Sequence, residues 1–541
     1  MDSFGQPTTG VNGTDKPIAV LKKYDNGSYG LLVYGSDFLI RGGELASSSM
    51  TSALFMSRII DDVVALGVNT IFGVVSWKNI EPIEGVFDFT ELDAIIALFR
   101  EKGLYLSLRW NGTLVGHGTD NLSDSVPSWV KTNAQRFPKV KRTEDVYDAQ
   151  QDEIVGKTRR TTEAISLFGD EIAEAEQNAF HALIGHIKLV NKSQHTIVMV
   201  QVGSLIGFKR NTRDYSVAAD AKFDSPVPTE LLSYYQAKGS AVEPGALRYG
   251  WDSFGQEDGE AETLFSAYYF ATYVEALATI CKRECGLPVF TDVAVNRQGP
   301  ALHGSAEGKM MRFWRFFTPS LSFFAARLLP GPSSKSIADF VARNNQPLLI
   351  LGQNNTDIEK IWVKFGNCNA LGVALTRIEA IDLATSPAPA HFCLLRDLTP
   401  TILTARNSDK KTVGFALTAV NRVDPDCVSS TNTTMCGMDV KCQHLDNQSH
   451  RNGGWGIVVE QEDGTLLVAG QAFQVKAKSL SPKATVTRVL DFVKKEVEGE
   501  GGGSLRSLRR FTAEDTNGGR AAQMPADTPM IAEIAFYAFE E

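Results

Sequence analysis

Long apolar runs, dense basic clusters and a secretory leader pattern are all missing from this 541-residue sequence. No stretch of about 18 consecutive apolar residues occurs, so we expect no membrane-spanning helix. The net charge is −9 and no Lys/Arg stripe is present, which makes nucleic acid an unexpected partner. Met1–Thr14 is polar and lacks the basic and apolar regions of a signal peptide, so we expect a cytoplasmic protein.

Cysteine is sparse, with seven residues in the whole chain, which argues against a disulfide framework. Cys281 and Cys285 are one helical turn apart, whereas Cys427, Cys436 and Cys442 crowd one loop. None of these groups has the pairing or histidine spacing of a zinc site. No glycine-rich phosphate loop is present either, so we expect no metal and no cofactor.

Short apolar segments alternate with longer amphipathic segments from Leu31 onward. This repeated order predicts parallel strands joined by helices, and the number of repeats favours a closed (β/α)8 barrel of the α/β class. An open, doubly wound sheet is the alternative. The predicted strands are Phe38–Gly43, Thr70–Val75, Leu104–Trp110, Thr196–Val202, Leu287–Val293, Pro347–Leu351 and Ala370–Thr376.

The pattern changes after Asn407, where short β-prone segments are separated by turn-rich loops. This spacing is typical of a β-sandwich. We therefore predict a flexible N-terminal tail over residues 1–20, a barrel over 21–407 and a C-terminal all-β sandwich over 408–541. The predicted strands of the sandwich are Thr412–Val420, Gly456–Glu460, Leu466–Ala469, Phe473–Ala477 and Ile531–Phe539.

Several separated motifs resemble one family of enzymes. Phe38-Leu-Ile-Arg-Gly-Gly-Glu-Leu45, the stretch from Trp77 to Phe89, Val126-Pro-Ser-Trp-Val-Lys131 and Thr516-Asn-Gly-Gly-Arg520 are similar to the β-galactosidases of glycoside hydrolase family 35. The most similar branch of that family ends in a β-sandwich. The resemblance implies a retaining mechanism, in which one glutamate acts as acid and base and a second attacks the sugar.

The resemblance breaks at the two catalytic glutamates. The family pattern Val-Glu-Asn-Glu reads Val202-Gly-Ser-Leu205 here, so Leu205 takes the place of the acid/base. Pro347-Leu-Leu-Ile-Leu-Gly352 likewise puts Gly352 where the nucleophile belongs. A missing proton-transfer or nucleophilic group lowers the rate by orders of magnitude, so we do not expect β-galactosidase activity.

Polar residues remain at other strand ends. We predict catalytic roles for Glu44, Lys78, His117 and Asp292, because a buried base beside a hydrogen-bond donor suits isomerisation, cyclisation or elimination. Arg377 and Glu379 follow the last strand. The replacements also predict an apolar cup at the carboxyl ends of the strands, with substrate-binding residues Trp77, Trp110, Asn111, Ser204, Leu205, Leu328 and Gly352.

Several functions stay open at this point. The first is a cofactor-independent isomerase, cyclase or lyase acting on an apolar small molecule, as in specialised metabolism. The second is a non-catalytic pseudo-glycosidase that binds a glycan or a protein partner. A sealed, inert mouth and a residual β-galactosidase are further alternatives. The sequence carries no signal for the oligomeric state.

Overall fold

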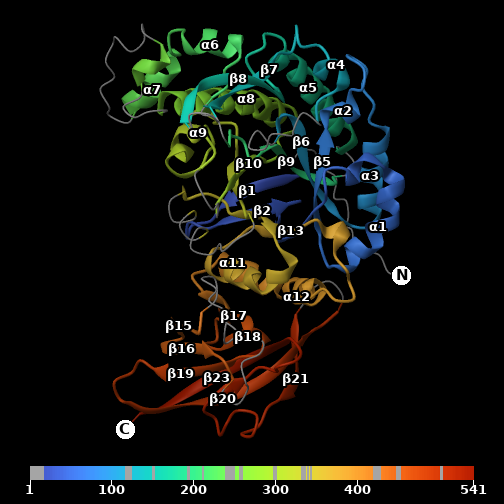
Figure 1. Cartoon of the computed structure of the whole chain (residues 1–541). Helices are drawn as coiled ribbons and strands as arrows, with labels where there is room; N and C mark the ends of the chain where they lie inside the picture. The colour runs from blue at the N-terminus through green and yellow to red at the C-terminus, as the bar shows by residue number, and fades with distance from the viewer. Residues whose placement is uncertain are drawn as a thin grey trace.

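The computed structural model contains a barrel ringed by helices and, next to it, a strand-rich domain (Figure 1). It describes residues 18–115, 125–148, 153–191, 195–209, 213–237, 250–254, 260–295, 301–329, 344–417, 428–445, 453–499 and 504–540, together with Ile337 and Phe340. Helix α12 (Ala388–Arg406) is followed after a short link by β14 (Thr412–Ala416), the first strand of the second domain. The predicted boundary at residues 407 and 408 falls in this link. Most of the predicted tail lies outside the described residues.

Eight parallel strands form the closed barrel, which confirms the predicted (β/α)8 fold. Neighbouring strands pair in parallel register, and the last strand returns to the first through the pair Gly372 and Ile40. Most of these strands are short runs of β-branched and apolar residues, as expected for strands covered on both faces. In barrel order they are β4 (Ile40–Glu44), β5 (Thr70–Ser76), β6 (Tyr105–Val115), β9 (Ile197–Ser204), β10 (Val289–Ala294), β11 (Phe323–Arg327), β12 (Leu349–Gln353) and β13 (Gly372–Thr376).

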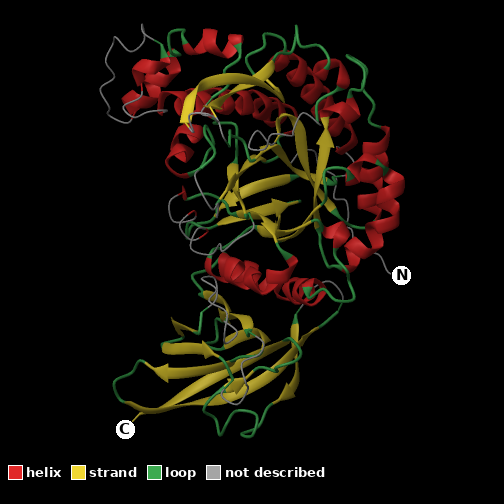
Figure 2. Cartoon of the chain, in the orientation of Figure 1, coloured by secondary structure: helices red, strands yellow, loops and turns green. Residues whose placement is uncertain are grey.

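Helices surround the barrel, as Figure 2 shows in red. The longest is α8, which by length and composition could cross a membrane; however, 72% of its most apolar window is buried inside the fold. A helix buried in the core of a folded protein has the same length and composition, so this helix alone is weak evidence for a membrane span. The main helices are α1 (Ala53–Ala65), α2 (Trp77–Ile80), α3 (Thr90–Glu101), α5 (Ile172–Asn191), α8 (Glu260–Cys285), α9 (Met311–Phe317) and α11 (Ile361–Asn367).

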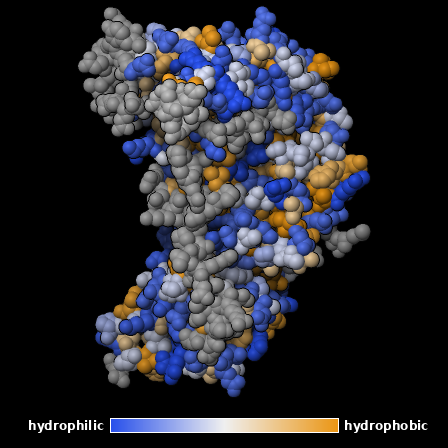
Figure 3. Space-filling model, viewed as in Figure 1, coloured by the Kyte–Doolittle hydropathy of each residue, from blue (hydrophilic) through white to orange (hydrophobic). Residues whose placement is uncertain are grey.

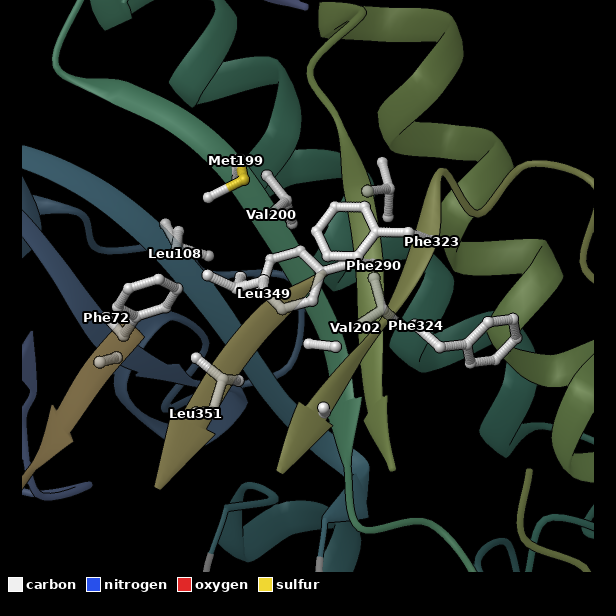
Figure 4. Packing of buried hydrophobic residues seen from close by; sticks show 14 of the residues in the cluster. Phe72, Leu108, Met199, Val200, Val202, Phe290, Phe323, Phe324, Leu349 and Leu351 are labelled. Atoms are coloured by element: carbon white, nitrogen blue, oxygen red, sulfur yellow. The ribbon is translucent and has the colours of Figure 1, made fainter. Parts of the chain in front are cut away.

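Apolar side chains of the barrel strands pack together, among them Leu108, Met199, Phe290 and Leu349 (Figure 4). Phe290 and Phe323 lie side by side on neighbouring strands, with ring centroids 5.0 Å apart. Phe324, the next residue along β11, points the other way and meets Trp314 of α9. This alternation is the strand period of two. Every second residue of each barrel strand therefore faces the interior of the barrel, here called the lumen.

Antiparallel strands that the sequence pattern did not reveal are added outside the barrel. Strands β1 (Ala19–Lys23), β2 (Tyr29–Val33) and β3 (Ser36–Phe38) form a small sheet that precedes β4. A long hairpin of β7 (Lys139–Asp148) and β8 (Glu153–Ile165) follows α4 (Ser128–Lys131). The hairpin is rich in charged residues, so it lacks the apolar periodicity that identifies a strand.

The C-terminal domain consists of two antiparallel sheets, which confirms the predicted sandwich. One sheet has the order β14-β17-β18-β23-β20-β21 and the other β15-β16-β19-β22. Buried residues from both sheets, including Val440 and Ile534, form one core. The remaining strands are β15 (Ser430–Met435), β16 (Met438–Gln443), β17 (Trp455–Glu460), β18 (Leu466–Gln471), β19 (Gln474–Ser479), β20 (Ala484–Val497), β21 (Leu505–Arg510), β22 (Ala522–Gln523) and β23 (Met530–Glu540).

The face shown in Figure 3 is mainly hydrophilic, with apolar residues in small separate groups. Among the described residues, the large apolar side chains that are exposed come from different elements. Leu54 lies on α1, Leu189 on α5 and Leu490 on β20. Scattered exposure of this kind is normal for a folded protein, so we do not infer an interface from it.

Three aromatic side chains join the barrel to the sandwich. Trp362 of α11 stacks on Trp455 of β17 with centroids 5.5 Å apart, and the His391 ring of α12 lies 4.0 Å from Trp455. The Trp362 Nε1–H donates to His391 Nδ1 at 3.0 Å. Burial at this junction lowers the pKa of His391 to about 3, because the charged imidazolium would be poorly solvated there.

We expect this junction to make stability depend on pH. An unfolded His391 binds a proton below about pH 6.5, whereas the folded protein binds it only near the lowered pKa of about 3. The unfolded state therefore holds more protons in this window, and the free energy of unfolding falls as the pH drops through it. His391→Gln should flatten this slope, as measured by urea unfolding at several pH values. An unchanged slope would contradict the assignment.

Candidate active site in the barrel mouth

Charged side chains meet in the lumen at the carboxyl ends of the barrel strands, the place where (β/α)8 enzymes carry their active sites. Arg327 of β11 contacts Glu44 of β4, and Arg109 of β6 also approaches Glu44. Neither strand is next to β4 in the barrel, so these contacts cross the lumen. We call Glu44, Arg109, Gln201, Asp292 and Arg327 the mouth cluster.

Arg327 bridges the two carboxylates of the mouth cluster. Its Nη2 lies 2.8 Å from Glu44 Oε2, and its Nε lies 2.5 Å from Asp292 Oδ2. The three side chains are only 11%, 8% and 0% exposed, respectively. Burial alone would lower the pKa of Arg327, but the charges and hydrogen bonds of Asp292 and Glu44 outweigh it and raise the pKa, so the guanidinium is protonated.

Asp292 is surrounded by donors. Its carboxylate accepts hydrogen bonds from Gln201 Nε2 at 2.9 Å, from Ser204 Oγ at 2.9 Å and from the Leu205 N–H at 2.8 Å, in addition to Arg327. Burial alone would raise the pKa of Asp292, but the charge and hydrogen bond of Arg327 and the Leu205 N–H outweigh it and lower the pKa. Asp292 is therefore a saturated anion, which makes it a poor general base.

Leu205 and Gly352, which the sequence comparison aligned with the family glutamates, each direct a backbone N–H at a carboxylate of the mouth cluster. Leu205 has φ +49 and donates its N–H to Asp292. Gly352 has φ +79 and donates its N–H to Glu44 Oε1 at 2.5 Å. A Cβ on Gly352 would lie 2.4 Å from the carbonyl oxygen of Leu328, so a side chain there forces the backbone to move. A Gly352→Phe substitution would therefore disturb the backbone rather than simply fill the mouth.

At the carboxyl ends of the strands the lumen is lined by charged side chains and not by the predicted apolar cup. Leu328 is 9% exposed, and its N–H bonds to the Leu351 carbonyl within the strand register. The groups that face each other across the lumen are the ionic groups of Arg327, Glu44 and Asp292. The sequence analysis identified Glu44 and Asp292 but missed Arg109 and Arg327, because only the barrel register brings these arginines to the carboxylates.

The other predicted site residues are spread more widely. Trp110 faces the helices, where it packs on Phe180 and donates to Glu176 Oε1 at 2.9 Å. Trp77 begins α2, is fully buried and meets Trp129 edge to face. Neither therefore joins the mouth cluster, since the strand period directs Trp110 outward. Lys78 follows Trp77 in α2 and is half-buried. After β13, Arg377 has φ +51, and Glu379 accepts a hydrogen bond from the Ala46 N–H. His117 lies outside the described residues.

One strand carries a column of unpaired polar atoms. Ser107, Arg109 and Asn111 alternate along β6 on the lumen side, as the contact of Arg109 with Glu44 shows. Ser107 Oγ, Arg109 Nε and Asn111 Oδ1 are all buried without a hydrogen-bond partner. The nearest carboxylate oxygen to Arg109 is 3.9 Å away on Glu44, too far for a hydrogen bond. Buried polar atoms are normally paired, so we treat this column as a ligand-facing surface.

No metal-type cluster of three His, Cys, Asp or Glu side chains occurs within the residues that the structure describes. The mouth cluster itself contains two arginines, whose charge opposes that of a cation. The residues of the mouth cluster can therefore bind a ligand through hydrogen bonds and ion pairs.

The fold and its mouth define a glycosidase-like (β/α)8 barrel. A family model described as beta-galactosidase, glycoside hydrolase family 42, matches residues 54–180. A domain of unknown function (DUF5597) matches residues 389–523, across the end of the barrel and the sandwich. No curated protein matches the chain.

Similar solved structures include glycosidases. The β-galactosidase from the psychrophilic Marinomonas ef1 is 12% identical with a TM-score of 0.43, over 67% of this chain and 60% of that chain. The β-galactosidase from the haloarchaeon Halorubrum lacusprofundi is 14% identical with a TM-score of 0.43, over 63% and 56%. Endo-glycoceramidase II from Rhodococcus sp. is 12% identical with a TM-score of 0.37, over 93% and 98%. The chain thus spans less than two thirds of either β-galactosidase.

Removing Arg327 tests the ion bridge. We expect Arg327→Met to lower the free energy of unfolding by about 3–5 kcal/mol, because two buried carboxylates lose their shared cation. Adding Asp292→Asn should restore part of the loss, since one uncompensated charge disappears. Denaturant unfolding measures both effects.

The matched control is Arg396→Met, which removes an exposed arginine 3.1 Å from Asp397. Its effect should stay within about 0.5 kcal/mol. Equal destabilisation by both arginine variants would contradict the bridge as the organising contact of the mouth.

Proposed function

We propose that this protein is a pseudo-glycosidase, a glycosidase-like barrel that binds a neutral, polyhydroxylated ligand of the sugar class in its mouth without hydrolysing it. The observation that carries this proposal is that both carboxylates of the mouth cluster are held by hydrogen bonds and ion pairs. Glu44 and Asp292 are each bound to Arg327 and to a backbone N–H. Of the functions considered, binding without hydrolysis needs neither carboxylate to change its protonation state.

Hydrolysis with retention requires a protonated carboxyl group and a free carboxylate nucleophile about 5 Å apart. The lowered pKa of Asp292 argues against a proton donor there. Glu44 uses its oxygens to accept from Arg327 and Gly352. With Leu205 and Gly352 at the positions of the family glutamates, the proposal includes the loss of the hydrolytic pair.

The column on β6 supports a sugar-like ligand. A hydroxyl group both donates and accepts, so vicinal hydroxyls suit the unpaired Arg109 donor and the unpaired Asn111 acceptor. Two carboxylates and two arginines give the mouth cluster no net charge, which favours a neutral ligand over an ion. An apolar ligand would leave these polar atoms buried and unpaired, at about 1–3 kcal/mol each.

The match of residues 54–180 to a beta-galactosidase model makes β-galactosides the first ligands to test. We also propose that the chain is related to the β-galactosidases of glycoside hydrolase family 35. The proposal further includes a cytoplasmic location and the absence of nucleic-acid, membrane and cofactor partners.

We expect lactose or a methyl β-galactoside to bind without turnover. Calorimetric titration of the full chain measures binding, and release of nitrophenol from nitrophenyl β-galactoside measures hydrolysis. Asn111→Leu should weaken binding by about tenfold or more, because a buried acceptor for a sugar hydroxyl is lost.

Asn432→Leu is the matched control, since Asn432 is an exposed amide on the sandwich. Its affinity should equal that of the unchanged protein. Turnover that Asn111→Leu abolishes would overturn the non-hydrolytic proposal, and equal affinity in both variants would remove the β6 column from the site.

Restoring both glutamates should not restore hydrolysis. In Leu205→Glu/Gly352→Glu, the new side chain at 352 meets the Leu328 carbonyl. The two added carboxylates also stand on residues whose N–H groups already bind Asp292 and Glu44. We expect a destabilised protein without galactosidase activity, as measured by thermal unfolding and the nitrophenol assay. Recovered turnover in a stable double variant would show that the surrounding site is still a hydrolytic one.

A further inference from the structure

Two thiols lie side by side at the end of the longest helix, away from the mouth. Cys281 and Cys285 are on the last turn of α8, with their Sγ atoms 3.3 Å apart. Cys281 is fully buried, and Cys285 is partly exposed. The two residues occupy positions i and i+4, which places their Cα atoms about 6 Å apart. Disulfides span Cα distances of about 4.4–6.8 Å, which this pair satisfies, but they also need Cβ atoms about 3.5–4.5 Å apart. Cβ atoms on neighbouring turns of a helix lie about 5–6 Å apart, so closure requires a movement of the last turn.

The end of the helix leaves room for adjustment. Cys285 is the last residue of α8, and Gly286 follows with φ +64. No atom outside its immediate neighbours lies within 4 Å of the Cβ position of Gly286. The last turn of a helix is also its least constrained part. The final turn can therefore rotate slightly to align two sulfur atoms.

The surroundings distinguish the two thiols. The hydrogen bond from the Cys281 thiol lowers the pKa of Cys285. Burial alone would raise this pKa, but the Leu287 N–H and the Lys188 ammonium lower it further. The Cys285 contact and burial raise the pKa of Cys281. Cys285 is thus the more reactive nucleophile, and Cys281 is the protected partner.

We propose that Cys281 and Cys285 form an oxidisable dithiol that closes to a disulfide within α8 when the protein meets hydrogen peroxide. The Cys285 thiolate attacks one peroxide oxygen, the O–O bond breaks, and hydroxide leaves while the sulfur becomes a sulfenic acid. Cys281 then loses its proton, its sulfur attacks the Cys285 sulfur, and the S–O bond breaks to release water. One peroxide is reduced to two waters, and two thiols are oxidised to one disulfide.

This pair lies at the opposite end of β10 from the mouth cluster. β10 begins at Val289, shortly after Cys285, and carries Asp292 toward its carboxyl end. The chemistry of the two thiols therefore does not depend on what the mouth binds.

Peptide mapping tests the proposal on the full chain. The protein is treated with hydrogen peroxide, the remaining thiols are alkylated, and the product is digested with trypsin. Lys282 and Arg283 stand between the two cysteines, so trypsin separates them unless a disulfide holds the fragments together. We expect a linked pair of fragments that dithiothreitol releases. Recovery of both cysteines in alkylated form, or linkage of either one to another cysteine, would overturn the proposal.

Single variants assign the roles. In Cys281→Ser, Cys285 should accumulate as a sulfenic acid that dimedone traps. In Cys285→Ser, buried Cys281 should stay reduced. Cys368→Ser is the matched control and should still give the linked pair. Sulfenic acid on Cys281 rather than Cys285 would overturn the assignment of the nucleophile.

Discussion

The bridge from Arg327 to Glu44 and Asp292 is the interaction on which the rest of the mouth depends. Two carboxylates buried in the lumen of a barrel are costly unless a cation and further donors compensate them. Arg327 supplies the cation, and Gln201, Ser204 and two backbone N–H groups supply the donors. The bridge joins β11 to its neighbour β10 and, across the lumen, to β4. It thereby fixes the relative positions of the strand ends that would hold a ligand.

The same bridge explains the unusual backbone at Leu205 and Gly352. Leu205 and Gly352 both have positive φ, and both turn their N–H toward a carboxylate of the bridge. A leucine with positive φ is strained, so a compensating contact must hold it. The hydrogen bond to buried Asp292 is such a contact. The backbone just after β9 and the irregular end of β12 are therefore shaped by the resident carboxylates.

The fold could be predicted from the sequence because buried parallel strands such as β9 are almost continuously apolar. The same property hid the site. When both faces of a strand are apolar, the pattern does not reveal which residues face the lumen, and Trp110 was assigned to the mouth although it packs on Phe180. Arg109 and Arg327 each stand within a strand, and their meeting at Glu44 depends on the closure of the barrel. Long-range register of this kind leaves no local signal.

Charge balance explains why the mouth cluster would not tolerate further carboxylates. Glu44 and Asp292 are neutralised by Arg109 and Arg327, so the mouth cluster carries no net charge. Two further glutamates at positions 205 and 352 would give this buried site a net charge of −2 by simple addition. In a poorly solvated lumen such an excess would be relieved by protonation or by movement of the backbone. Uncharged residues such as leucine at 205 and glycine at 352 therefore preserve the charge balance of the arginine-bridged mouth.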